Sequence, residues 1–70
     1  MHISYKKLWK LLIDRDMKKK ELAEKAGISS TSIAKMGRNE NITMDVIVKI
    51  CEALQCDIGD IVELTPDNEK

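Results

Sequence analysis

The sequence predicts an all-α domain, a compact bundle of five helices, and three observations support that fold class. Leu, Ile, Lys and Glu are abundant, whereas the chain has one Pro, three Gly and only two aromatic residues, a composition that favours helices. Apolar residues recur with helical spacing in successive segments. Seventy residues suffice for one domain, near the lower size at which a core is stable without disulfides or metal.

The first helix is expected from an N-cap at Ser4 to about Asp16. Its apolar residues fall at i, i+3, i+4, i+7 and i+8, so we expect all five to be buried: Tyr5, Leu8, Trp9, Leu12 and Ile13.

Two short helices are predicted next, at about 19–26 and 30–37. Gly27 ends the first of them, because glycine takes a left-handed conformation without strain. Ser29 is the expected N-cap of the second. Ile33 and Met36 should face inward, and the expected outward residues are Ser30, Thr31, Ser32 and Lys35.

A fourth helix should begin after a cap at Thr43 and run to about Gln55. It has two apolar stripes, the second of which includes Val46 and Ile50, so it is either central to the bundle or partly covered by a partner. Asp57 should cap a short fifth helix with Ile58, Ile61 and Val62 buried, and residues 65–70 should form a frayed tail.

The sequence offers no candidate for catalysis, a metal, a cofactor or a small-molecule ligand. Cys51 and Cys56 have C-x4-C spacing and His2 is the only histidine, which excludes the usual redox and zinc patterns and leaves two reduced, largely buried thiols. No Ser–His–Asp set or phosphate-binding glycine loop is found, so we expect no enzyme. No apolar run reaches the ~18 residues of a membrane span and no signal-peptide pattern opens the chain, which predicts a single cytoplasmic domain.

The formal net charge is zero, but the charges are unevenly distributed. Residues 1–38 carry ten basic and four acidic side chains, whereas residues 39–70 carry two basic and eight acidic ones. Such a molecule can present a basic face to phosphate groups. Chance alone also gives short domains an uneven charge, so the asymmetry is weak evidence.

Residues 19–38 carry the spacing of a helix-turn-helix. Ala23 supplies the small side chain that a steep helix crossing needs, Gly27 supplies the turn, and Ile33 and Met36 fix the second helix to its scaffold. With "ELAEKAGIS", "SIAKM" and "ICEALQCDIGDIVEL", the chain resembles the phage-repressor and Cro-type (Xre-like) family over nearly its whole length. The resemblance implies a lambda-repressor-like fold, with the helix-turn-helix at about 19–38.

The resemblance also implies that helix 30–37 enters the major groove of DNA. The base contacts would then come from Ser30, Thr31 and Lys35, and the phosphate contacts from Lys18, Lys19, Ser29, Ser32 and Arg38. The sequence departs from the family in three ways: Ser30 and Thr31 discriminate bases less than Gln or Arg would, Lys18 replaces a Ser or Thr cap, and Gly37 stands where a larger polar residue is frequent. Two alternative interpretations remain. Ser29–Ser32 would then be only the capped start of a helix, and Lys18–Lys20 only a run of lysines in contact with water.

The predicted function is a sequence-specific, repressor-like transcriptional regulator that binds double-stranded DNA as a homodimer. The second apolar stripe makes Val46 and Ile50 the tentative dimer contacts. The alternative function is a protein-interaction module, such as an antitoxin-like or adaptor partner, with little specific DNA binding.

Overall fold

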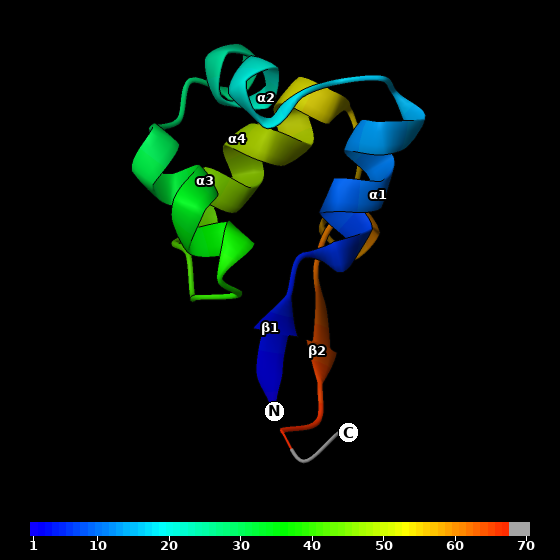
Figure 1. The fold of residues 1–70 in the computed structure, drawn as a ribbon, viewed down its shortest axis with the longest axis vertical. Helices are drawn as coiled ribbons and strands as arrows, with labels where there is room; N and C mark the ends of the chain where they lie inside the picture. The colour runs from blue at the N-terminus through cyan, green and yellow to red at the C-terminus, as the bar shows by residue number, and fades with distance from the viewer. Residues whose placement is uncertain (68–70) are drawn as a thin grey trace.

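The computed structural model describes residues 1–67, in which four α-helices surround one core (Figure 1). The helices are α1 (Lys6–Asp14), α2 (Lys19–Ala26), α3 (Ser30–Gly37) and α4 (Met44–Leu54). A single 3₁₀ turn, η1 (Ile58–Asp60), and two short strands, β1 (His2–Ser4) and β2 (Glu63–Thr65), complete the described part. In Figure 1, α4 lies between α1 on one side and the α2–α3 pair on the other. Within residues 1–67, no helix has the length and apolar character needed to cross a membrane.

The predicted fold class was therefore right about a small helical domain and wrong in two details. The expected fifth helix is only the turn η1, although Asp57 caps it as predicted, since Asp57 Oδ1 accepts from the Ile58 N–H at 2.7 Å. The two strands pair antiparallel, with Ile3 opposite Leu64. Three residues are too few to show an alternating pattern, and the pairing joins residues about sixty positions apart, so local sequence gave no signal for it.

The predicted helix boundaries hold for the helix-turn-helix segment. Ser29 Oγ accepts the Ser32 N–H at 3.2 Å, and Thr43 Oγ1 accepts the Val46 N–H at 3.4 Å, so both predicted caps are confirmed. The first helix begins one residue later than expected, because Ser4 belongs to β1 and Tyr5 is the N-cap of α1. It also ends earlier, at Asp14.

The core is built from all four helices and the segment after η1. Its fully or nearly fully buried side chains are Tyr5, Leu8, Leu12, Leu22, Met36, Ile47, Ile50, Leu54 and Ile61. Two predictions of burial fail: Ile13 is 76% exposed, and Ile58 is 38% exposed at the edge of η1. Trp9 and Val62, which were also predicted to be buried, are only partly buried against the core.

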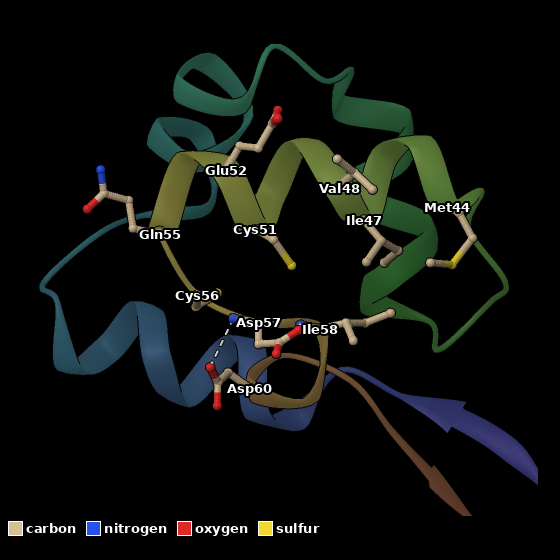
Figure 2. Close-up of a pocket in the computed structure, with 10 residues that line it drawn as sticks. All are labelled: Met44, Ile47, Val48, Cys51, Glu52, Gln55, Cys56, Asp57, Ile58 and Asp60. Atoms are coloured by element: carbon tan, nitrogen blue, oxygen red, sulfur yellow. Dashed lines mark hydrogen bonds between the residues drawn. The ribbon is translucent and has the colours of Figure 1, made fainter.

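One face of α4 is buried and the opposite face is open. Ile50 has no exposed surface, so its predicted role as a dimer contact was wrong: the side chain is used up by the core of its own chain. Val46 is half-buried. Figure 2 shows the open side, where Met44 and Val48 project from α4.

Both cysteines are free and half-buried beside α4, less buried than predicted. Burial is the main cause that raises the pKa of the Cys51 and Cys56 thiols. Both side chains are therefore protonated thiols at neutral pH.

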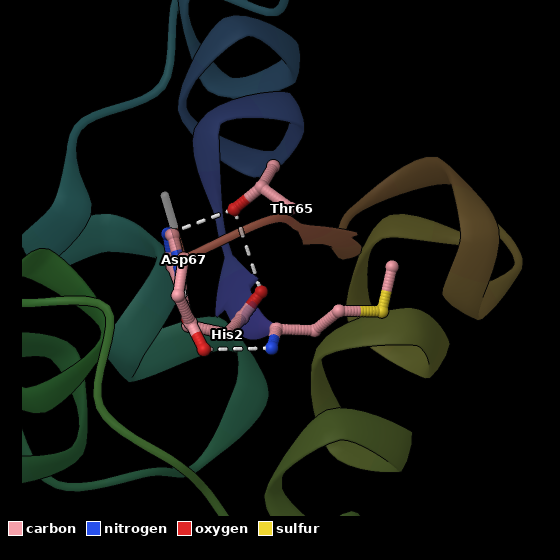
Figure 3. Close-up of polar contacts among 4 residues, drawn as sticks. His2, Thr65 and Asp67 are labelled. Atoms are coloured by element: carbon pink, nitrogen blue, oxygen red, sulfur yellow. Dashed lines mark hydrogen bonds and ion pairs between the residues drawn. The ribbon is translucent and has the colours of Figure 1, made fainter. Parts of the chain in front are cut away.

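Polar contacts at the open end of the sheet join the first two residues of the chain to Thr65 and Asp67 (Figure 3). Asp67 Oδ2 lies 2.7 Å from the N-terminal ammonium group and Asp67 Oδ1 lies 3.1 Å from His2 Nδ1. Thr65 Oγ1 lies 2.7 Å from His2 Nε2. Thr65 and Asp67 thus make contacts within the predicted frayed tail, the fraying itself stays a prediction, and the remainder of the tail, 68–70, lies outside the described residues.

Replacement of Ile50 by Ala should lower the free energy of unfolding by about 2–5 kcal/mol, because it leaves a cavity in the core. Leu64→Ala, at a side chain that is 64% exposed, should cost less than about 1 kcal/mol. Urea unfolding followed by circular dichroism measures both. Equal costs for the two variants would contradict the assignment of Ile50 to the core.

The sheet contacts should weaken in acid. Hydrogen bonds from the N-terminal ammonium group and then from His2 lower the pKa of Asp67. A carboxyl group whose pKa is lowered by folding stabilises above its unfolded pKa, and this contribution is lost as the pH falls through the folded value. We expect the NMR signals of His2 and Thr65 to follow the Asp67 titration, at a pKa below that of an aspartate in a peptide. Asp67→Asn should remove this transition, and an ordinary Asp67 pKa would contradict the assigned contacts.

Candidate nucleic-acid interface

The turn between α2 and α3 depends on Gly27. Its φ of 71° is in the left-handed region, and its N–H donates to the Ala23 carbonyl at 2.9 Å. The Ile28 N–H donates to the same carbonyl at 3.0 Å, and the Ile28 side chain packs partly buried against the core. The prediction for Gly27 is confirmed. These two hydrogen bonds to the Ala23 carbonyl end α2, and the chain continues directly to Ser29, the N-cap of α3.

Buried residues fix both helices from one side. Leu22 of α2 and Met36 of α3 have no exposed surface, and Ile33 packs partly buried against the same core. These buried residues fix the position of α3. The side chains on the opposite face of α3 are therefore not needed for packing.

The outward face of α3 is short and polar. Ser30, Thr31 and Lys35 are exposed there, as helical spacing predicted. Ala34 is exposed on the same face, between Thr31 and Lys35. The sequence analysis did not name Ala34 as an outward residue. Its position three residues after Thr31 and four after Ser30 places it on their face of the helix, so it was predictable.

Two of the predicted phosphate-binding residues are engaged in the helix start. Besides its bond to the Ser32 N–H, Ser29 Oγ lies 3.3 Å from Ser32 Oγ. Ser29 is exposed and Ser32 is partly covered. The structure brings the two hydroxyl groups together at the N-terminus of α3, where helix dipole and free N–H groups favour an anion.

The start of α2 lies beside the same face. Lys18 has no acceptor to cap the helix, but its own N–H donates to Glu21 Oε1 at 2.8 Å, which replaces part of the missing cap. Lys19 Nζ lies 4.5 Å from the centre of the Trp9 ring, a cation–π contact with α1 that the sequence did not predict. Lys19 and Ser30 also line one shallow hollow between α2 and α3.

Arg38 lies at the C-terminal end of α3 and is paired. Its Nε donates to Glu40 Oε2 at 2.7 Å. This hydrogen bond is the main cause that raises the pKa of Arg38 and lowers the pKa of Glu40. Because the pair is on the surface, a phosphate can exchange with the carboxylate as the partner of Arg38.

Two further contacts, both missed from the sequence, hold the loop after α3. The Tyr5 hydroxyl donates to the Glu40 carbonyl at 2.7 Å, and the Tyr5 N–H donates to Asn39 Oδ1 at 3.4 Å. Burial raises the pKa of the Tyr5 hydroxyl, which keeps it a donor. Asn39 itself has φ 58°, a left-handed conformation that asparagine tolerates. The end of α3 is thus tied to the start of α1.

Gly27→Ala should destabilise the domain by about 1 kcal/mol, because alanine is strained at positive φ. A Cβ at Gly27 would meet no atom within 4 Å, so the cost is one of backbone conformation alone. Gly37→Ala is the matched control: Gly37 is the last residue of α3, has equally free space and has no positive φ, so alanine should stabilise the domain by about 0.5 kcal/mol. Thermal unfolding measures both, and effects of the same sign would contradict the assigned turn.

Comparison with known proteins agrees with this geometry. Residues 7–67 match the family described as the Cro/C1-type HTH DNA-binding domain. The chain is 38% identical over 61 residues to the uncharacterized HTH-type transcriptional regulator YozG of Bacillus subtilis (strain 168), a match that covers 84% of this chain and 73% of YozG. The crystal structure of the transcriptional regulator VanUg matches with a TM-score of 0.90 and 57% identity, over 94% of this chain and 88% of VanUg. The chain belongs to the Cro/C1-type helix-turn-helix family of DNA-binding transcriptional regulators.

Proposed function

We propose that this chain is a sequence-specific, repressor-like regulator that binds double-stranded DNA as a homodimer, with α3 in the major groove. The observation that supports the proposal most is the outward face of α3. It is exposed, carries small polar side chains and one lysine, and adjoins the N-terminus of α2. The phage repressors that the sequence resembles supply the analogy for repression.

The base contacts are assigned to Ser30, Thr31 and Lys35. Lys35 can donate to guanine O6 and N7, and the methyl group of Thr31 can contact a thymine methyl. Ala34, on the same face, adds a second small apolar contact of this kind. Side chains this short let the α3 backbone approach the base edges closely. They also discriminate weakly, so DNA shape contributes to specificity.

The phosphate contacts are assigned to the two helix starts and to the end of α3. Lys18 and Lys19 are exposed at the start of α2, and the Trp9 ring holds the Lys19 ammonium group in place. Ser29 and Ser32 act at the start of α3, where N–H groups favour an anion. Arg38 contributes by exchanging Glu40 for a phosphate.

We propose a homodimer because the surface of α3 that would contact DNA bases is small. One eight-residue helix reads only a few base pairs, so a useful affinity requires two helices on a palindromic site. Of the two residues predicted for the dimer, Val46 is partly accessible and Ile50 is not. The dimer surface therefore has to be sought elsewhere on the molecule.

Selection from a random pool of duplexes tests the proposal. The native chain should enrich a palindrome, and Ser30→Ala/Thr31→Ala/Lys35→Ala should abolish the enrichment while keeping the helical circular dichroism. The physical reason is that removal of a bidentate base contact costs about 1–3 kcal/mol of discrimination.

The control is Lys25→Ala, which removes one positive charge from the last turn of α2, beside the C-terminal end of α4. It should enrich the same palindrome as the native chain. No enrichment by the folded native chain at moderate salt would contradict the proposal and favour a protein partner instead.

A further inference from the structure

An open groove runs between α4 and η1, and its walls are largely apolar (Figure 2). Met44, Val48 and Ile58 line it while exposing 61%, 48% and 38% of their surfaces. The half-buried Cys51 of α4 also lines the groove, which has a volume of about 790 Å³. Apolar side chains gathered on an open surface mark a site of contact.

The charged side chains along this groove are all carboxylates, those of Glu52, Asp57 and Asp60. Asp57 and Asp60 accept backbone N–H groups that cap η1. Within residues 1–67, none of the three carboxylates has a basic partner within 4.0 Å. A molecule that fills the groove should therefore present an apolar side chain flanked by positive charge.

A second hollow, on α1, is directly continuous with the groove. The two share three lining residues, Gln55, Cys56 and Asp60. On the α1 side the hollow carries three basic side chains, Lys7, Lys10 and Arg15, and one acidic side chain, Asp14. An acidic surface and a basic one thus meet at one line on the molecule.

Of the three basic side chains, Lys10 is the one still available. Lys7 Nζ donates to the Gly59 carbonyl at 3.1 Å, and Arg15 Nη1 donates to the Leu54 carbonyl at 2.6 Å. Lys10 is exposed and, in the part of the chain that the structure describes, has no ion pair or hydrogen bond of its side chain.

Next to Lys10 lies the apolar side chain that the core leaves out. Ile13 is 76% exposed and lines a shallow hollow together with Lys10 and Asp14. The outer face of α1 therefore presents an isoleucine flanked by Lys10 and Asp14, and Lys10 supplies the positive charge that the groove of α4 requires.

We propose that the groove is filled by α1 of a second copy of this chain, in a two-fold dimer whose axis passes beside Gln55 and Cys56. A two-fold axis brings residue i against j and j against i. Because the basic hollow and the acidic groove adjoin each other at the axis, each copy places its Ile13 and Lys10 on the groove of the other. The proposal rests on the dimeric DNA-binding function proposed above and supplies its missing interface.

Charge selects this arrangement over a symmetric contact of groove with groove. Groove on groove would bring Glu52, Asp57 and Asp60 of both copies together, and opposed like charges are costly at an interface. The reciprocal contact instead pairs each carboxylate rim with an ammonium group.

The position of the axis also suits DNA. The molecule measures 35 × 23 × 18 Å, and Figure 1 shows α1 and α3 on opposite sides of its width. An axis on the α1 side therefore places the two α3 helices at opposite ends of the dimer, and reading two successive turns of DNA requires them to lie ~34 Å apart.

Sedimentation of the native chain without DNA, from micromolar to millimolar concentration, tests the interface. Lys10→Glu and Glu52→Lys should each weaken dimerisation about tenfold or more, since each reversal acts twice in a two-fold dimer. The double variant Lys10→Glu/Glu52→Lys should return to within about threefold of native, because it exchanges the charges across the interface. Ile13→Ser and Val48→Asp should each weaken the dimer while leaving the helical circular dichroism unchanged. Lys20→Glu, the same charge change on α2, is the control and should have no effect.

Rescue by the charge exchange supports the reciprocal contact. A dimer that tolerates Lys10→Glu and Ile13→Ser but not Val48→Asp would overturn it in favour of groove on groove. A native chain that stays monomeric yet enriches one DNA sequence would overturn the interface and leave the DNA-reading proposal intact. A dimer that shows the expected rescue but enriches no DNA sequence would support the interface and overturn the DNA-reading proposal.

Discussion

The burial of one face of α4 is the constraint on which the rest of the structure depends. Ile47, Ile50 and Leu54 are covered by segments from both halves of the chain, with α2 packed against α4 on one side and α1 on the other. The core that forms on this face of α4 includes Met36 of α3. Met36 and the turn at Gly27 together fix the position of α3. Its outward residues carry no part of the packing, so they are free to be small and polar.

The same constraint leaves surfaces that the core does not use. An α-helix buried on one side keeps its other side in water, and on α4 that side includes the exposed apolar residues Met44 and Val48. The apolar stripe of α1 continues from the buried Leu12 to Ile13, which the core does not cover and which therefore stays exposed. The sheet brings β2 beside β1, which leads directly into α1 (Figure 1). The closure of the fold thus gathers the surfaces of α1, η1 and α4 that the dimer proposal joins.

Features with a local signal were predictable from the sequence. The bounds of α2 and α3, the left-handed Gly27 and the caps at Ser29 and Thr43 all depend on residues within four positions of each other. The exposure of Ser30, Thr31 and Lys35 follows from helical periodicity.

Features that depend on distant partners were not predictable. The strands pair across about sixty residues, and the Tyr5 hydroxyl finds its acceptor thirty-five residues away. The two stripes of α4 look equivalent in sequence, and only the assembled core shows that Ile50 is inside and Met44 outside. The Lys19–Trp9 contact likewise requires α1 and α2 to be placed side by side.

The central claim, that α3 presents its outward face to the major groove, is tested most directly by NMR of the labelled chain on a selected duplex. We expect the largest amide shifts on binding at residues 18–20 and 29–38, with contacts from the Thr31 methyl group to base protons. Shifts concentrated on the sheet or on the outer face of α1, with none on α3, would contradict it.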